Sequence, residues 1–265
     1  YNDKLFAQGV TGKEGDHALK LDGNTIFHYS PNSHAVYSEG KQIKSDRECF
    51  WPLNDGTVEL WINPQWKRSD AQTFCVIDAR NNYGPRPKNK AIRQKIGSLF
   101  NTTYTPKRGV WKISVLDGSG KRRDFTFKHK LELKKWSHIA VQYGKNGIEC
   151  FVNGKKVFAN SKFSFVKHSI SKEFYHNDQI AQVVAIGNDA NRARQIATKY
   201  APATVDSLRI SGGRRYTKEF SPEKELKADA ATYALFDFDR SIDGKSSMGL
   251  GKVYGSINSS TFLRS

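Results

Sequence analysis

This sequence contains no long apolar run. Its hydrophobic stretches fall well short of the roughly 18 consecutive apolar residues that a membrane-spanning helix requires, so no membrane span is predicted. There is also no Met start and no positively charged segment followed by an apolar one, which is the pattern of a secretory signal peptide. These features are expected of a processed or trimmed chain.

Cysteine is scarce, with three among 265 residues. Cys49, Cys75 and Cys150 have none of the short spacings that bind zinc, and an odd number allows at most one disulfide. Cys75 and Cys150 fall inside apolar stretches, where a thiol usually acts as a small hydrophobic side chain. The cysteines therefore predict no metal centre, and they leave the disulfide state and the redox compartment open.

The motifs of common enzymes are missing as well. Glycoside hydrolysis needs two carboxylates roughly 5–10 Å apart, yet Glu59 is the one acid in its apolar segment and Asp78 ends the next. Gly212-Gly213 lacks the other residues of a nucleotide-binding loop. No two histidines have the spacing of a zinc or iron site. We therefore predict no catalytic residues.

Helical periodicity is almost absent, and short β-type segments take its place. Residues 189–199 are the one modest helix candidate, and they equally resemble a basic loop. Residues 57–62 alternate as a half-buried strand should, whereas residues 73–78 are apolar enough for burial on both faces. Further strands are expected at residues 111–116, 125–131, 136–143, 148–152, 155–158, 182–186, 204–210 and 233–238.

Turn residues separate these segments. Gly144–Gly147 divides two of the expected strands, and Asn153-Gly154 supplies the two positive-φ residues of a type I′ hairpin. Short strands punctuated by turns, without intervening helices, predict an all-β antiparallel two-sheet sandwich. Because there is no internal repeat and no Pro/Ser-rich linker, we expect one domain over residues 1–265.

Four parts of the chain share a recognisable ordered pattern. They are Ala18–Gly23 (ALKLDG), Thr57–Pro64 (TVELWINP), Trp136–Val141 (WSHIAV) with Phe151–Lys155 (FVNGK), and Val205–Ser211 (VDSLRIS) followed by Arg215-Tyr216 and Phe220. In this order they resemble the concanavalin A-like, laminin-G-like jelly-roll domains of secreted bacterial proteins. The resemblance implies a jelly-roll sandwich and an extracytoplasmic location. Two N-glycosylation sequons, at Asn101 and Asn258, matter only in a eukaryotic secretory setting.

Single residues in and near these segments also have expected roles, the aromatic ones from their chemistry and the calcium ligands from the resemblance. Trp61 and Trp136 are expected to pack as structural residues, and His138 to be structural rather than a ligand. Related jelly-roll proteins hold one structural Ca²⁺ between the N-terminal region and the closing strand, where Asp16 and Asp206 stand in this sequence. Calcium takes six to eight oxygen ligands, many of them backbone carbonyls. A stabilising calcium ion is therefore the one cofactor expected.

What the sequence has in excess is positive charge. Lys and Arg number 43 against 26 Asp and Glu, a formal net charge of +17 that concentrates anionic partners around the protein. The candidate ligand-binding residues lie in three predicted basic loops: Arg86, Lys88, Lys90, Arg93 and Lys95; Lys121, Arg122 and Arg123; and Arg192 and Arg194. Lys130 and Lys134-Lys135 lie close in sequence to the second group. Arginine matches the geometry of sulfate, carboxylate and phosphate, although a solvated surface that binds nothing specific has the same composition.

Three functions remain open, because this fold serves lectins, hydrolases, lyases and adhesion modules. The first is a non-catalytic recognition module that binds an acidic polysaccharide or glycoprotein at its loop rim. The second is a structural or accessory subunit of an extracytoplasmic or multiprotein assembly, suggested by the long irregular segments 79–98 and 160–180. The third is a polysaccharide lyase or glycoside hydrolase, for which His168 and Tyr175-His176 lie in one loop. No strand interleaves exposed aromatic and basic residues, so nucleic acid is not expected as a partner.

Overall fold

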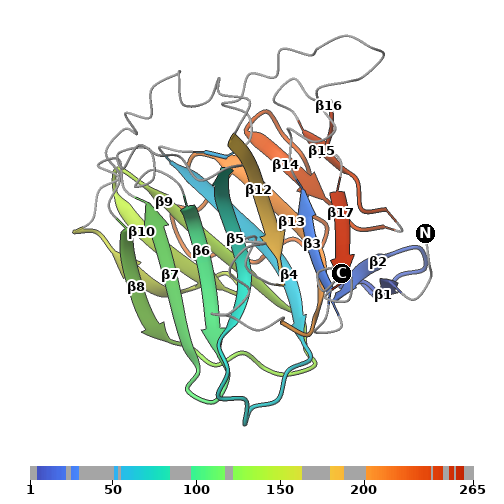
Figure 1. Ribbon diagram of the computed structural model, residues 1–265, viewed down its shortest axis with the longest axis horizontal. Coiled ribbons are helices and arrows are strands. Elements are labelled where there is room, and N and C mark those ends of the chain that lie inside the picture. The colour runs from blue at the N-terminus through green and yellow to red at the C-terminus, as the bar shows by residue number, and fades with distance from the viewer. Residues whose placement is uncertain are drawn as a thin grey trace.

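The computed structural model describes residues 5–21, 25–29, 51–52, 55–83, 97–116, 122–162, 180–187, 201–239, 241–246, 251–253 and 255–259. These described residues form β-strands and no α-helix. Accordingly, none of them builds a helix of the length and apolarity that crossing a membrane would take. The strands lie in two antiparallel sheets, one behind the other (Figure 1).

The larger sheet has ten strands within the described part of the chain. They are β1 (Phe6–Gln8), β2 (His17–Leu21), β4 (Gly56–Pro64), β9 (Ser137–Gly144), β10 (Gly147–Val152), β11 (Lys155–Asn160), β13 (Ala203–Gly212), β14 (Thr232–Phe236), β15 (Gly244–Ser246) and β16 (Gly251–Val253). The main order is β11-β10-β9-β4-β13-β14-β15-β16, and β2 pairs with the first part of β13 and with β1. The central strands β4 and β13 pair along their whole lengths.

The second sheet has seven described strands, in the order β17-β3-β12-β5-β6-β7-β8. They are β3 (Thr25–Tyr29), β5 (Phe74–Tyr83), β6 (Gly97–Thr105), β7 (Val110–Leu116), β8 (Arg122–Lys128), β12 (Ile180–Ile186) and β17 (Gly255–Ser259). This sheet lies in front in Figure 1, with β8 at the left and β17 at the right. Both sheets thus combine strands from the beginning and the end of the chain.

The hydrophobic core lies between the sheets and takes large side chains from both. Leu60 of β4 and Phe100 of β6 are buried in one continuous cluster. Phe27 of β3 makes edge contacts with Phe236 and Phe238 at centroid distances of 5.0 and 5.1 Å. Each such side chain contributes about 1.5–3 kcal/mol by its removal from water. A core built from both sheets confirms the predicted all-β sandwich.

Most local predictions are confirmed. The expected strands correspond to β4, β5, β7–β14, with boundaries shifted by a few residues, although Leu131 lies beyond the end of β8. Asn153 and Gly154 have φ values of 50° and 73°, as the predicted hairpin turn requires. Cys75 and Cys150 are buried thiols outside any disulfide, and burial raises the pKa of Cys150 well above its ordinary value. Cys49 and the helix candidate 189–199 lie outside the described residues.

The loops of the sandwich lie at two opposite ends. Residues 65–73, 106–109 and 128–136 join β4 to β5, β6 to β7 and β8 to β9, and they lie at the bottom of Figure 1. We call these three segments the lower rim. The opposite, upper end carries the start of β8 and the turn between β9 and β10, because strands that pair antiparallel place alternate connections at opposite ends.

Candidate functional site

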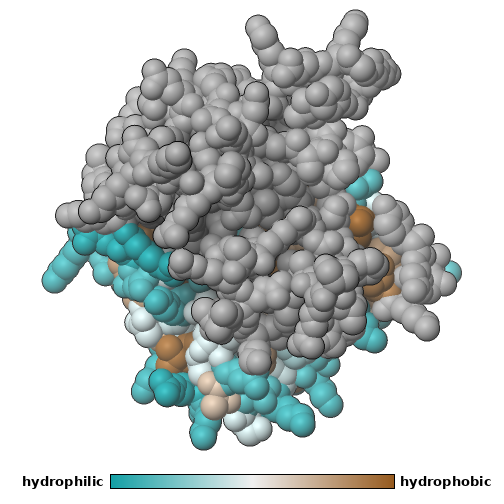
Figure 2. Space-filling view, viewed as in Figure 1, coloured by the Kyte–Doolittle hydropathy of each residue, from teal (hydrophilic) through white to brown (hydrophobic). Residues whose placement is uncertain are grey.

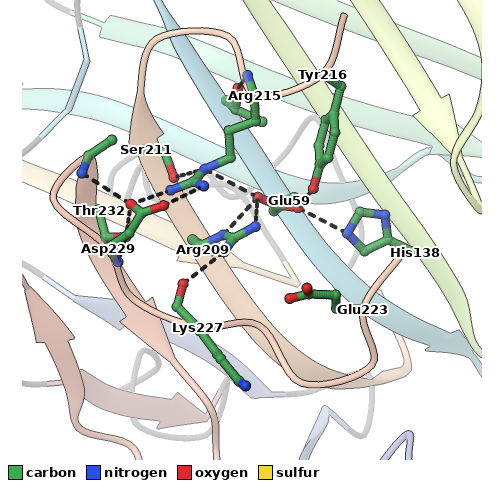
Figure 3. A network of polar contacts seen from close by, with 12 residues as sticks. Glu59, His138, Arg209, Ser211, Arg215, Tyr216, Glu223, Lys227, Asp229 and Thr232 are labelled. Atoms are coloured by element: carbon green, nitrogen blue, oxygen red, sulfur yellow. Dashed lines mark hydrogen bonds and ion pairs between the residues drawn. The ribbon is translucent and has the colours of Figure 1, made fainter. Parts of the chain in front are cut away.

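A buried polar cluster centred on Glu59 lies on the face of the larger sheet that points away from the core (Figure 3). One carboxylate oxygen, Oε1, accepts hydrogen bonds from the Arg209 guanidinium at 2.8 Å. The other, Oε2, accepts one from the Tyr216 hydroxyl at 2.5 Å and lies 3.1 Å from Nε2 of His138. Strand register produces this arrangement, because Arg209 stands directly opposite Glu59 across the β4–β13 pair.

The electrostatics of the cluster favour a charged Glu59. Its side chain is 0% exposed, and burial alone would raise its pKa. The hydrogen bond with His138 and the positive charge of Arg209 outweigh burial, so the pKa of Glu59 lies below its ordinary value. Burial and the neighbouring Glu59 carboxylate raise the pKa of Tyr216 well above its ordinary value. Tyr216 therefore stays protonated and donates its hydrogen bond to a carboxylate.

Residues 213–231 cover this cluster, and we call them the cover segment. The indole Nε1 of Trp61 donates a 3.0 Å hydrogen bond to the backbone oxygen of Glu223. The rings of Tyr216 and Phe220 stack with centroids 3.6 Å apart and planes 2° apart. The aromatic and backbone contacts of the cover segment thus replace solvent above the outer face of the larger sheet.

Two further pairs hold the cover segment. Arg215 donates to both carboxylate oxygens of Asp229, at 2.8 and 2.6 Å, and this pairing holds the pKa of Asp229 well below its usual range. Gln142 of β9 donates to the backbone oxygen of Tyr216 at 2.7 Å and accepts from its backbone N–H at 3.1 Å. The segment has no strand or helix of its own, so side chains of the sheet determine its path.

This geometry overturns the expectation that β4 is half-buried. The residues of β4 are buried on both faces, with Asn63 alone partly exposed, because the cover segment lies over the side chains of Glu59 and Trp61. The Glu59 cluster has residue types found in hydrolase sites, but its carboxylate has no exposed surface with which to approach a glycosidic bond. Its Glu59–Arg209 ion pair is buried and hydrogen-bonded, whereas Nδ1 of His138 is buried without a hydrogen-bond partner in the described part of the chain. His138 is part of this packing, as expected of a structural histidine.

The predicted calcium ligands are brought into one region of the structure. Asp206 Oδ2 accepts the backbone N–H of Val10 at 2.7 Å, and Asp16 Oδ2 accepts that of Thr11 at 2.7 Å. Burial raises the pKa of Asp206 to about 7, with the charges of Asp16 and Asp239 adding to the rise. Three carboxyl groups therefore share this region. The described residues nevertheless include no group of three or more His, Cys, Asp or Glu side chains arranged so that they could hold a metal ion.

Two of the predicted ligand-binding residues are described by the structure. Arg122 and Arg123 are exposed at the upper end of β8, and Arg122 Nε lies 3.2 Å from the Asp124 carboxylate. Asp124 also pairs with Lys112 at 2.6 Å, so part of the charge at this end is neutralised. The other predicted ligand-binding residues lie outside the described residues: Arg86, Lys88, Lys90, Arg93, Lys95, Lys121, Arg192 and Arg194.

The structure separates basic residues that are close in sequence. Lys130 and Lys134-Lys135 follow Arg122-Arg123 closely in the chain, but they lie at the other end of β8, on the lower rim. A strand of seven residues spans about 20 Å, so the two groups do not form one patch. The lower rim instead places Lys130 beside the Lys107-Arg108 turn, where a Cβ added to Gly109 would lie 2.7 Å from Lys130 Cγ. Sequence spacing alone did not predict this grouping.

Comparison with known proteins identifies the fold family. A family model described as "Concanavalin A-like lectin/glucanases superfamily" matches residues 37–219, more than half of the chain. A solved structure from Bacteroides ovatus, to which carbohydrate binding has been attributed, has a TM-score of 0.51 at 12% sequence identity. It covers 91% of this chain, and this chain spans 60% of its length. That likeness shows the fold.

Other solved structures give lower scores. The carbohydrate-binding module of a Ruminococcus gnavus sialidase, solved with sialyllactose, has a TM-score of 0.45 at 10% identity, with 71% of this chain and 87% of that chain covered. A pentraxin of Limulus polyphemus has a TM-score of 0.43 at 11% identity, with 72% and 73% covered. No curated protein matches the sequence.

Proposed function

The chain belongs to the concanavalin A-like lectin/glucanases superfamily, and we propose that within it the chain is a non-catalytic recognition module. Its ligand is an acidic polysaccharide or glycoprotein, bound through loops at the ends of the sandwich. The proposal includes residues 1–265 as one domain that acts outside the cytoplasm. The pairing of β1 with β2, of β2 with β13 and of β17 with β3 supports one domain, because strands outside residues 37–219 complete both sheets.

The observation that carries this proposal is the large surplus of positive charge on loops. The net charge of +17 attracts anionic ligands, and loops on a rigid sandwich are the usual place for binding residues. The Glu59 carboxylate has no exposed surface, and this supports a binding role rather than a catalytic one. The carbohydrate binding attributed to the Bacteroides ovatus protein of the same fold agrees with a sugar ligand.

A glycan array that includes sulfated and uronic-acid sugars tests the proposal, read at about 50 and about 300 mM salt. We expect saturable binding to acidic glycans that persists in part at the higher salt, because ionic contacts alone weaken steeply over that range. Incubation with each bound glycan should release neither reducing ends nor unsaturated uronates. Uniform loss of signal with salt would contradict a specific site, and release of either product would contradict a non-catalytic role.

A structural calcium ion is part of the proposal. Asp16 and Asp206, with Asp239 nearby, would supply carboxylate oxygens, and backbone oxygens would have to complete the six to eight ligands that calcium takes. A bound divalent cation would neutralise the mutual repulsion of these carboxylates and tie the N-terminal hairpin to the closing strand. Its role would be stabilising.

Calcium should raise the melting temperature of the wild-type chain by roughly 5–10 °C at about 100 times its Kd, and a chelator should reverse the rise. The variant Asp206→Asn should lose this response, because an amide oxygen binds calcium less strongly than a carboxylate. Differential scanning calorimetry at matched ionic strength measures the melting temperatures of the wild type and of Asp206→Asn. The control variant is Asp70→Asn on the lower rim, which should keep the rise in melting temperature with calcium. Equal shifts in wild type and Asp206→Asn would contradict a site at Asp206.

A further inference from the structure

The lower rim is one continuous surface, although its three segments are far apart in sequence. Lys107 N donates to Asp70 O at 3.0 Å, which joins the first segment to the second. His129 N donates to the oxygen of Gly109 at 2.8 Å, which joins the second to the third. Lys134 N donates to the oxygen of Pro64 at 2.9 Å and returns the third segment to the end of β4. Main-chain hydrogen bonds therefore hold the three segments side by side.

Exposed cations dominate this surface. The lower rim carries eight Lys and Arg residues, all exposed, against two acids, Asp70 and Glu132. The cations are Lys67, Arg68, Lys107, Arg108, Lys128, Lys130, Lys134 and Lys135. Among the described residues, Lys135 pairs with Glu132 at 2.5 Å, and no salt bridge is formed by the other seven. Mostly hydrophilic side chains occupy the lower end in Figure 2. The rim thus has a surplus of positive charge with few internal partners.

The base of the rim is a buried aromatic cluster. Trp66 stacks on Phe74 at 5.5 Å and contacts Tyr104 at 5.4 Å, with all three rings buried. The Tyr104 hydroxyl accepts the backbone N–H of Leu131 at 3.3 Å, which fixes the third segment on this aromatic base. A surface whose backbone is already ordered loses less conformational entropy on binding than a mobile loop does. The positions from which the cations extend are therefore set before any ligand arrives.

The composition of the rim favours a polyanionic chain over nucleic acid bases or a lipid surface. Its described aromatic residues, Trp66 and Trp136, are buried or half-buried, so neither offers the fully exposed ring on which bases stack. Leu131 and Leu133 are likewise buried or half-buried, and the exposed Ala71 offers a single methyl group, so the described rim has no large exposed aliphatic side chain to enter a bilayer. What remains is a set of guanidinium and ammonium groups, which recognise sulfate and carboxylate groups.

We propose that the lower rim is the binding site for a linear acidic polysaccharide, with Lys67, Arg68, Lys107 and Arg108 at its centre. This inference rests on the proposed function and assigns it a place and a ligand class. Two Lys-Arg pairs on adjacent, hydrogen-bonded turns present four charges to successive anionic groups of one chain. The site differs from the basic loops predicted from sequence, of which Arg122 and Arg123 lie at the upper end.

Four proteins test the inference: the wild type and three variants, each with four cations changed to glutamine. The rim variant changes Lys67, Arg68, Lys107 and Arg108, and the loop variant changes Arg86, Lys88, Lys90 and Arg93. The control variant changes Lys145, Lys155, Lys162 and Lys218, which are exposed elsewhere. All three variants lose the same charge, so differences between them report position. Circular dichroism and the melting temperature confirm that each is folded.

Dissociation constants are measured for heparin, polygalacturonate, neutral dextran and single-stranded DNA at about 50 and about 300 mM salt. We expect the rim variant to bind heparin or polygalacturonate about 30-fold more weakly at the lower salt, since each lost ionic contact weakens binding severalfold. Its salt dependence should also be shallower. The control and loop variants should stay within about threefold of the wild type, an effect of net charge alone.

The possible failures are distinguishable. If the wild type binds acidic glycans and the loop variant alone loses affinity, the proposed function stands and the rim is the wrong site. If the wild type binds no glycan, the proposed function fails together with this inference. Tighter binding of single-stranded DNA than of either polysaccharide, lost in the rim variant, would keep the site and overturn its ligand class.

Discussion

Glu59→Ala should lower the free energy of unfolding by about 3–5 kcal/mol, because it leaves a buried cation without its partner. Arg209 is 8% exposed at its side chain and would lose its carboxylate partner while keeping its hydrogen bond to the backbone oxygen of Lys227, 2.8 Å away. The Tyr216 hydroxyl would also lose its acceptor. Urea unfolding followed by tryptophan fluorescence measures the change, which corresponds to a fall of roughly 10 °C in melting temperature.

An exposed ion pair provides the matched control. Glu225 lies 3.3 Å from Lys13, and both side chains are more than 60% exposed, so Glu225→Ala should cost no more than about 1 kcal/mol. The Glu59 effect should also depend on pH. Because the pKa of Glu59 in the folded chain lies below its ordinary value of 4.5, its contribution is fully present above about pH 5 and is lost as the pH falls through the folded pKa. If Glu59→Ala and Glu225→Ala lower the free energy of unfolding by the same amount, the cost of removing Glu59 from water offsets its attractive interactions.

Gly154→Ala should destabilise the chain by about 2–5 kcal/mol and loosen the cover segment. Gly154 has a φ of 73°, which costs an alanine about 1–2 kcal/mol. A Cβ there would lie 1.7 Å from the backbone oxygen of Phe220, so the cover segment must move, at a further cost of about 1–3 kcal/mol. Movement would also weaken the 3.1 Å hydrogen bond from Phe220 N to Gly154 O.

Gly12→Ala separates the two causes. Gly12 has nearly the same φ, 71°, but no atom lies within 4 Å of the added Cβ, so this variant should show the backbone strain alone, about 1–2 kcal/mol. Limited proteolysis should cut the cover segment faster in Gly154→Ala than in Gly12→Ala. If the two variants unfold at the same denaturant concentration and resist protease equally, the hairpin turn does not anchor the cover segment.

The Glu59→Ala and Gly154→Ala experiments also test the function of the chain, because both concern the cover segment. The cover segment makes the Glu59 cluster inaccessible, and this sealing supports a binding role for the chain. A Gly154→Ala chain that gained hydrolytic or lyase activity on the array glycans would make the cover segment a gate over a catalytic group. A chain that is merely less stable agrees with the structural role argued for Glu59.

Strand β6 shows where sequence patterns were misleading. Residues 97–105 were not predicted as a strand, and their centre is polar, with Asn101, Thr102 and Thr103 forming a glycosylation sequon. In the structure Asn101 is buried, and its side-chain amide donates to Asp78 at 3.1 Å and contacts the Cys75 sulfur at 3.2 Å. A polar residue can occupy a buried strand when neighbouring strands supply its hydrogen-bond partners. Those partners are on β5 and are not visible in local periodicity.

Register provides a second case. Between Asp206 and Leu208 the β4–β13 pairing shifts by one residue, with Ser207 at a φ of 51°. This β-bulge places Arg209 directly opposite Glu59 while Asp206 reaches toward the N-terminal hairpin. A Ser at this position carries no sequence signal for a bulge, so neither the ion pair nor the carboxylate group could be predicted in detail.

The sequence by itself determined the strand-rich architecture, the hairpin at Asn153-Gly154, the family and the excess of positive charge. These properties depend on composition and on interactions between residues close in the chain. Tertiary structure alone decided that the outer face of β4 is covered and that cations from three separate turns meet on the lower rim. Both outcomes depend on which loops return to the same end of the sandwich and on contacts across more than 150 residues, such as that of Trp61 with Glu223. Local patterns do not encode those distances, because packing and strand register determine them only after the sheets have formed.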